Sequence, residues 1–173
     1  KGKLAISVSG KSIPILISSN EWPGVIRAFK DLQTDIRKVT SVSPELFTDQ
    51  VPGAKEIIIA GTIGKSSIID DLIKRKKVDV TGIAGKWETF LIQVIQNPLP
   101  GVKKAMVIAG SDKRGTIYGI YEVSKQIGVS PWYWWADVPV LKKNELYANE
   151  GRYVQGSPSV KYRGIFLNDE APD

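Results

Sequence analysis

AMVIAGSDKRGTIYGIYEVSKQIG, residues 105–128, is the stretch that decides the fold of this chain. Its opening run, Ala105 to Ala109, is continuously apolar. Such a run is typical of a β-strand that is covered on both faces. Ser111 or Asp112 can then cap a helix by accepting hydrogen bonds from its free N–H groups. The pattern predicts a central buried strand followed by a capped helix.

The predicted helix, Arg114 to Gln126, has one apolar side. Ile117, Ile120 and Ile127 recur at helical spacing, and Gly128 stands where a C-terminal cap glycine belongs. A single apolar stripe of this kind predicts that the helix packs on the sheet through that side.

Two glycines, Gly115 and Gly119, lie one turn apart in this helix. Glycine lowers helix propensity because it exposes the backbone and loses much conformational freedom on folding. We therefore expect another part of the chain to pass close to that side of the helix.

The rest of the chain alternates between strand and helix patterns. Further strands are predicted at 4–8, 13–17, 57–60, 87–95, 152–155 and 160–167, with a loop at 141–149. The first two strands form a hairpin by pattern. Helices are predicted after Asn20, which is a plausible cap, with Pro23 in the first turn, and again after Ser67. The fold class is an α/β (α+β) sandwich, a mixed sheet with helices packed on it.

Composition excludes several classes of chemistry. The chain has 173 residues with no histidine and no cysteine, and its net charge is +6. Disulfides, thiol chemistry, histidine-based triads and the commonest zinc ligand are thereby absent. We expect no cofactor, no metal site and no membrane span. The positive charge suits an acidic polymer.

Two local patterns point to nucleotide or nucleic-acid binding, and both are rejected. Gly61 and Gly64 precede Lys65 and Ser66, but only two residues separate the glycines, whereas a phosphate-binding loop needs four. The basic run Lys74 to Lys77 ends a predicted helix, where cations offset the helix dipole. No aromatic residue is interleaved with it, so a solvated helix end is favoured over a nucleic-acid surface.

Four consecutive aromatic residues, Trp132 to Trp135, come after the central helix. They can pack in the core or against another domain, because such rings bury large areas. Alternatively, one ring can stack on the face of a sugar. Neighbouring residues cannot all point into one cleft, which favours packing. We expect the cluster to seal this domain against the part of the protein that lies beyond Pro139, with at least one ring partly exposed.

The end of the sequence, KYRGIFLNDEAPD, reads as a strand, Tyr162 to Leu167, that leads into polar and charged residues. Asn168, Asp169 and Glu170 stand at its carboxyl end. In a barrel of parallel strands, that end holds the residues for chemistry and ligand binding. A solvated strand end is the alternative interpretation.

Four stretches carry a family resemblance: GTIGKSSIIDDLI, GKWETF, IAGSDKRGTIYGIYEVSKQIGVSPWYWWADVP and VKYRGIFLNDEAP. With them the chain resembles the N-terminal region of glycoside hydrolase family 115, the xylan α-1,2-glucuronidases, over most of residues 20–173. Its Gly-Thr-Ile-Tyr-Gly helix is more distantly similar to the N-terminal α/β domain that precedes the barrel in glycoside hydrolase families 67 and 20.

The resemblance implies an enzyme that removes glucuronic acid or its 4-O-methyl ether from glucuronoxylan by single-step inversion. That chemistry belongs to a (β/α)₈ barrel. Residues 1–158 are then the N-terminal α/β domain, and residues 159–173 contain the first strand of a truncated barrel. The resemblance gives a substrate-binding role to Asp169, and also to Asn168 and Glu170, and no catalytic residue to this chain.

Elementary chemistry agrees with that division. Inversion needs two carboxyl groups, roughly 6.5–9.5 Å apart, on opposite sides of the bond. Asp169 and Glu170 are adjacent, and neighbours on a strand face opposite ways. They are therefore not a catalytic pair, and we expect the chain alone to be inactive.

The expected partners are glucuronoxylan or a related acidic polysaccharide and the barrel domain of the same polypeptide. The expected location is extracellular or periplasmic, with a signal peptide outside this chain. A different class remains as an alternative, a free-standing carbohydrate-binding or interaction module.

Overall fold

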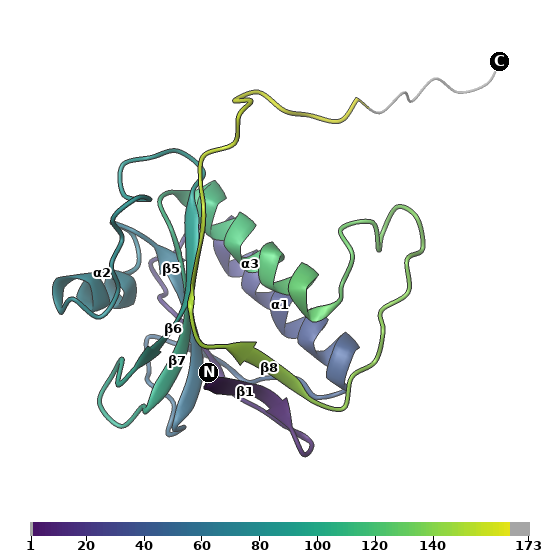
Figure 1. Ribbon diagram of the computed structural model, residues 1–173, viewed down its shortest axis with the longest axis horizontal. Helices are drawn as coiled ribbons and strands as arrows, with labels where there is room; N and C mark the ends of the chain where they lie inside the picture. Colours follow the sequence, from purple (N-terminus) through teal and green to yellow (C-terminus); the bar gives the residue numbers. More distant parts are fainter. Residues whose placement is uncertain (1, 167–173) are drawn as a thin grey trace.

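The computed structural model describes residues 2–166, which form one mixed main sheet, a small second sheet and three helices (Figure 1). The strands are β1 (Lys3–Val8), β2 (Lys11–Ser12), β3 (Ile15–Ile17), β4 (Leu46–Thr48), β5 (Glu56–Thr62), β6 (Phe90–Gln96), β7 (Lys104–Gly110), β8 (Leu146–Asn149) and β9 (Arg152–Gln155). The helices are α1 (Pro23–Thr40), α2 (Ser67–Lys74) and α3 (Lys113–Ile127).

The main sheet has the order β4-β3-β5-β7-β6-β9. Strands β4, β3, β5 and β7 are parallel to one another, whereas β6 is antiparallel to both β7 and β9. Strand β7 lies between β5 and β6, and the run from Ala105 to Gly110 is buried. The predicted central position of this strand is confirmed.

Helices cover both faces of the main sheet. Helices α1 and α3 lie on one face, and α2 lies on the other, as Figure 1 shows. The small sheet, of order β2-β1-β8, shares the core of the α1–α3 side through Leu4, Ile6 and Leu146. The predicted fold class, an α/β (α+β) mixed sheet with helices packed on it, is confirmed. Within residues 2–166 no helix combines the length and the apolar character that crossing a membrane requires.

The predicted caps and close contacts of α3 are confirmed. Asp112 is the N-terminal cap and accepts a hydrogen bond from the backbone N–H of Gly115 at 2.7 Å. Gly128 ends the helix with a φ of 113°, a left-handed conformation that glycine adopts without steric cost. A Cβ at Gly115 would collide with the carbonyl oxygen of Thr89, and one at Gly119 would meet Ile108 and Phe90. The glycines allow α3 to lie directly on the sheet.

Helix α1 has the predicted apolar face but a different start. Apolar residues recur along it at steps of three and four, which predicts one buried face. These residues, Val25, Phe29, Leu32, Ile36 and Val39, are all buried. The predicted cap, Asn20, is wrong: the cap position is Trp22, whose side chain makes no capping bond, and Pro23 is the first helical residue. Proline lacks an N–H and its φ already suits a helix, so the start needs less capping.

The predicted hairpin at the start of the chain is only half present. Strand β1 does pair with a strand that follows it, but this strand, β2, ends at Ser12, before the predicted strand at 13–17 begins. The chain then crosses to the main sheet, where β3 pairs in parallel with β4 and β5. Pro14 stands at the crossing and has no N–H to continue the hairpin ladder.

Two strands lie where loops were predicted, at 141–149 and in the stretch from the end of α1 to Lys55, where the residues Thr40 to Pro44 predict the end of a helix and the start of a loop. Strand β8 pairs with β1 within the stretch 141–149, and β4 pairs with β3 after α1. Both are short, three or four residues, so their alternation is too brief to recognise. Their partners are supplied by distant parts of the chain, which a local pattern does not reveal.

A buried carboxylate ties the start of α1 to the end of β5. Glu21 is 4% exposed and accepts hydrogen bonds from the backbone N–H and the hydroxyl of Thr62, at 2.5 and 3.0 Å. The Thr62 hydroxyl also lies 2.7 Å from that of Thr116 on α3. Burial raises the pKa of Glu21, and its hydrogen bonds with Thr62 oppose the rise. This network joins α1, β5 and α3.

The close contact at Gly115 predicts a large cost for any side chain there. Gly115→Ala should lower the free energy of unfolding by about 3 kcal/mol, because the colliding group is a backbone carbonyl that cannot rotate away. The matched control is Gly24→Ala in α1, where a Cβ would meet only Ile117 at an ordinary 3.5 Å. The control should change that free energy by less than about 1 kcal/mol. Urea unfolding of both variants checks this, and equal stabilities would contradict the close packing.

The raised pKa of Glu21 predicts a pH dependence of stability. The folded state binds this proton more tightly than the unfolded state, so the free energy of unfolding falls as pH rises from about 4.5 through the raised pKa. Glu21→Gln should remove that fall and gain stability relative to the native chain across this window. Glu45→Gln, which removes a carboxylate from an exposed position, is the matched control. Urea unfolding over a pH series checks this, and a pH-independent difference at Glu21 would contradict it.

Candidate functional site

The predicted substrate-binding residues, Asn168, Asp169 and Glu170, lie outside the described residues. The chain can be followed toward them through the C-terminal segment, residues 156–166. Residues 160–166 form no strand in the described structure, and Ile165 and Phe166 are 78% and 90% exposed. A strand needs a neighbour for its backbone groups. The predicted strand is therefore wrong for residues 160–166, which have no neighbouring strand among residues 2–166. The assignment of residues 159–173 to a barrel stays a prediction.

Arg163 holds the C-terminal segment on the domain. Its guanidinium donates a hydrogen bond to the carboxylate of Glu88 and another, at 3.2 Å, to the hydroxyl of Tyr118. The rings of Trp87 and Tyr118 lie 5.9 and 6.0 Å from the guanidinium carbon. In Figure 1 the segment rises past the amino-terminal end of α3. One arginine therefore makes ionic, hydrogen-bonded and aromatic contacts with the domain.

The surroundings of Glu88 favour a contact between its carboxylate and Arg163. Its side chain is only 6% exposed, and its other oxygen accepts from Arg114 at 2.8 Å. Its backbone has a φ of 54° and its N–H donates to Asp112 at 2.8 Å. The hydrogen bond from Arg114, and then that from Arg163, lowers the pKa of Glu88. The carboxylate therefore stays charged and is held between two cations.

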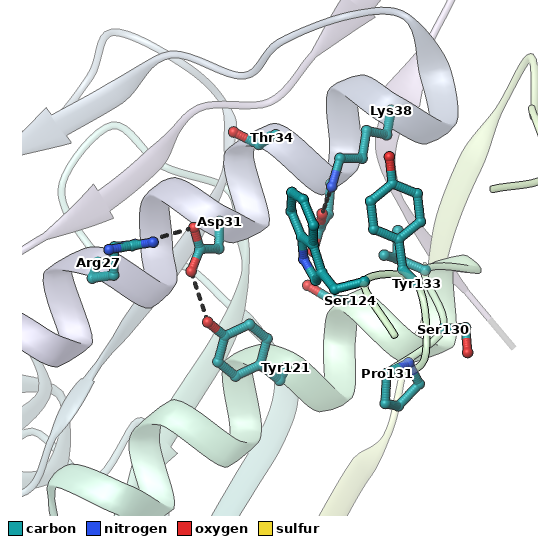
Figure 2. A pocket seen from close by; sticks show the side chains of 12 residues that line it. Arg27, Asp31, Thr34, Lys38, Tyr121, Ser124, Ser130, Pro131 and Tyr133 are labelled. Atoms are coloured by element: carbon teal, nitrogen blue, oxygen red, sulfur yellow. Dashed lines mark hydrogen bonds and ion pairs between the residues drawn. The ribbon is translucent and has the colours of Figure 1, made fainter. Parts of the chain in front are cut away.

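A pocket of about 440 Å³ lies between α1 and α3. Figure 2 shows Tyr121 of α3 reaching across to Asp31 of α1. The Tyr121 hydroxyl donates to Asp31 at 2.7 Å, and partial burial, with this bond, raises the pKa of Tyr121 to about 12. The pocket is lined by Arg27, Asp31, Thr34, Asp35, Lys38, Tyr121, Ser124, Val129, Ser130, Pro131, Tyr133 and Trp134.

The α1–α3 pocket suits binding better than catalysis. Asp31 accepts from Tyr121 and lies 3.6 Å from Arg27, and Asp35 accepts from Lys38 at 3.2 Å. A glycosidase acid must instead direct a proton at the leaving oxygen of a substrate. Both carboxylates of this pocket already accept hydrogen bonds from side chains of the domain.

The tryptophan loop, Trp132 to Trp135, is largely exposed. Trp132, Trp134 and Trp135 are 62%, 78% and 68% exposed, which confirms the prediction of at least one exposed ring. Tyr133 alone packs against the core. Exposed apolar area on this scale is typical of a surface that contacts another molecule or domain.

The rejected patterns have structural explanations. Gly61 lies in β5, where a Cβ would collide with Ser66 and with the carboxylate of Glu21. Ser66 caps α2, whose last residue is Lys74, at the start of the basic run. Across residues 2–166 no group of three or more carboxylates, histidines or cysteines is arranged to hold a metal ion.

Sequence reasoning missed the contact between Glu88 and Arg163. The two residues are 75 positions apart, and no periodicity links them. The available signal was indirect, because Glu88 lies in GKWETF and Arg163 in VKYRGIFLNDEAP, two of the stretches that carried the family resemblance. The pairing of Tyr121 with Asp31 across two helices was missed for the same reason.

The chain was compared with family models, curated proteins and solved structures. No family model matches the chain, and no curated protein matches it. Among solved structures, it is similar to BtGH115A, a family GH115 4-O-methyl-α-glucuronidase with specificity for decorated arabinogalactans. The TM-score is 0.73 and the sequence identity 35% over 94% of this chain, which spans only 19% of that enzyme. The resemblance to the N-terminal region of a glycoside hydrolase family 115 enzyme is thereby confirmed.

Proposed function

We propose that this chain works within a longer glycoside hydrolase that releases glucuronic or 4-O-methylglucuronic acid from an acidic polysaccharide. The observation that carries the proposal is 35% identity over 94% of the chain, with the same fold, to a 4-O-methyl-α-glucuronidase. Because the chain spans 19% of that enzyme, the activity is assigned to the longer protein. Glucuronic acid release by inversion is the proposed chemistry.

We propose only that the substrate polymer carries uronic acid side groups, and not which polymer it is. Glucuronoxylan is the substrate expected from the sequence resemblance, whereas the similar enzyme has specificity for decorated arabinogalactans. Both expectations share a uronic acid side group, and a net charge of +6 suits a polymer that carries carboxylates. The proposed location is extracellular or periplasmic, where such polymers are met.

The proposed role of this domain is to support a (β/α)₈ barrel. Trp132, Trp134 and Trp135 expose large apolar areas at the carboxyl end of α3, and Arg163 holds the C-terminal segment at its amino end. A domain that docks against a barrel would bury such rings. The acid and base of the reaction are then residues of the barrel, with Asn168, Asp169 and Glu170 at the end of its first strand.

A second candidate is a carbohydrate-binding module. The observation that favours it is the α1–α3 pocket, which combines the rings of Tyr133 and Trp134 with hydrogen-bonding groups. Sugar affinity of the chain alone, lost in a Trp134→Ala variant, would favour this candidate over the supporting role.

The proposal predicts that the longer protein, and not this chain alone, releases uronic acid. The 173-residue chain should release no uronic acid from glucuronoxylan or from glucuronic-acid-decorated arabinogalactan, because one strand end cannot hold an acid and a base at the required separation. The longer protein should release it from at least one polymer. Chromatography of released uronic acid checks both. Release by the chain alone would contradict the supporting role, and no release by the longer protein would contradict the hydrolase.

Asp169 offers a sharper test in the longer protein. Asp169→Ala should lower kcat for uronic acid release by about 100-fold or more while leaving the unfolding temperature unchanged, because a residue at the carboxyl end of a barrel strand serves the site. The matched control is Asp71→Ala on α2, a half-exposed carboxylate paired with Arg75. A fully active Asp169 variant would remove this residue from the proposed site.

A further inference from the structure

We propose that Glu88 is a positioning residue, which acts through Arg163 to fix the segment that leads to Asn168, Asp169 and Glu170. The proposal rests on the proposed function for the role of those three residues. The contact between Glu88 and Arg163 itself lies within the described residues. Glu88, with Arg114 on one oxygen and Arg163 on the other, joins α3 to the C-terminal segment.

Hydrogen bonds hold Glu88 and its neighbouring backbone in place. Asp112 accepts from the backbone N–H groups of both Glu88 and Gly115, at 2.8 and 2.7 Å. The next residue, Thr89, exchanges hydrogen bonds with Ser111 at 3.0 and 3.1 Å. Glu88 is thus held by its own backbone, by Thr89 and by Arg114. With one oxygen bonded to Arg114, the other oxygen is left to accept from Arg163.

The contact differs from an ordinary surface ion pair. Exposed pairs contribute little, because water screens the charges and two long side chains lose freedom. Here the carboxylate is 6% exposed and the arginine 36%, and the rings of Trp87 and Tyr118 flank the guanidinium. Aromatic faces favour a cation that is partly removed from water. Arg163 is therefore held by an ionic contact and two aromatic contacts, while about a third of its side chain stays in solvent.

The contact limits where the proposed substrate residues can lie. Asn168 is five positions beyond Arg163, from 168 − 163. Five residues span at most about 18 Å when fully extended. Ser157 adds a second attachment by donating to the carbonyl of Trp87 at 2.8 Å. The domain therefore limits how far from Glu88 the three proposed substrate residues can lie.

Two variants separate positioning from folding. Arg163→Gln frees the C-terminal segment and leaves Glu88 paired with Arg114, so the domain keeps its internal ion pair. Glu88→Gln removes the charge that both arginines contact. Glu45→Gln removes a carboxylate from an exposed position and is the matched control. The unfolding temperature of each variant shows whether the domain itself is intact.

The first experiment measures the contact in the 173-residue chain. The chain has no cysteine, so Ile165→Cys, at an exposed position, can carry a single spin label. The electron paramagnetic resonance line shape should show a slowed label in the otherwise native chain and in the Glu45→Gln variant. It should show a mobile label in the Glu88→Gln and Arg163→Gln variants. Equal mobility in all four proteins would overturn the proposal.

The second experiment measures positioning in the longer protein. Glu88→Gln and Arg163→Gln should each lower kcat for uronic acid release by about 10- to 100-fold with little change in KM. The double variant should be no worse than either single variant, because both remove one interaction. Unchanged kcat, or additive losses, would overturn the positioning role. If the longer protein releases no uronic acid, the proposed function fails, and the spin-label result still decides whether Glu88 fixes the segment.

Discussion

The carboxylate of Asp112 is the interaction on which the described architecture most depends. One of its oxygens accepts from the N–H of Gly115 and so begins α3, and the other accepts from the N–H of Glu88 just before β6. Strand β7 ends at Gly110, two residues before Asp112. The central strand, its antiparallel neighbour and the helix on top of them therefore meet at one carboxylate. Charge-assisted bonds to backbone N–H groups are among the stronger ones that a protein makes.

The polar groups at the carboxyl ends of the parallel strands are used internally. In doubly wound folds these ends form the crevice that binds ligands. Here Glu21 accepts from Thr62 at the end of β5, and the Thr62 hydroxyl contacts Thr116. Ser66 caps α2 at the same edge. These groups hold helices on strands, which is consistent with the supporting role proposed for this domain.

The sequence predicted the parts of the fold that local patterns encode. The apolar run of β7, the stripe and caps of α3, and the buried face of α1 are all recorded in residues close together in the chain. The parts it did not predict depend on distant partners. Strand β8 is a strand because β1 is available beside it. The pairing of Glu88 with Arg163 likewise exists only once β6, α3 and the C-terminal segment are brought together.

The exposed tryptophans fit an interface better than a sugar-binding platform. A platform needs a ring whose faces are free and whose orientation is fixed. The Nζ of Lys38 lies 5.1 Å from the ring centre of Trp134, and Tyr133 meets that ring nearly perpendicularly, at 85°. Those contacts occupy part of the one tryptophan that lines the α1–α3 pocket. Trp132 and Trp135 do not line it, and they expose most of their surface in the same loop. An interface can use rings that point in different directions, whereas a single sugar ring cannot.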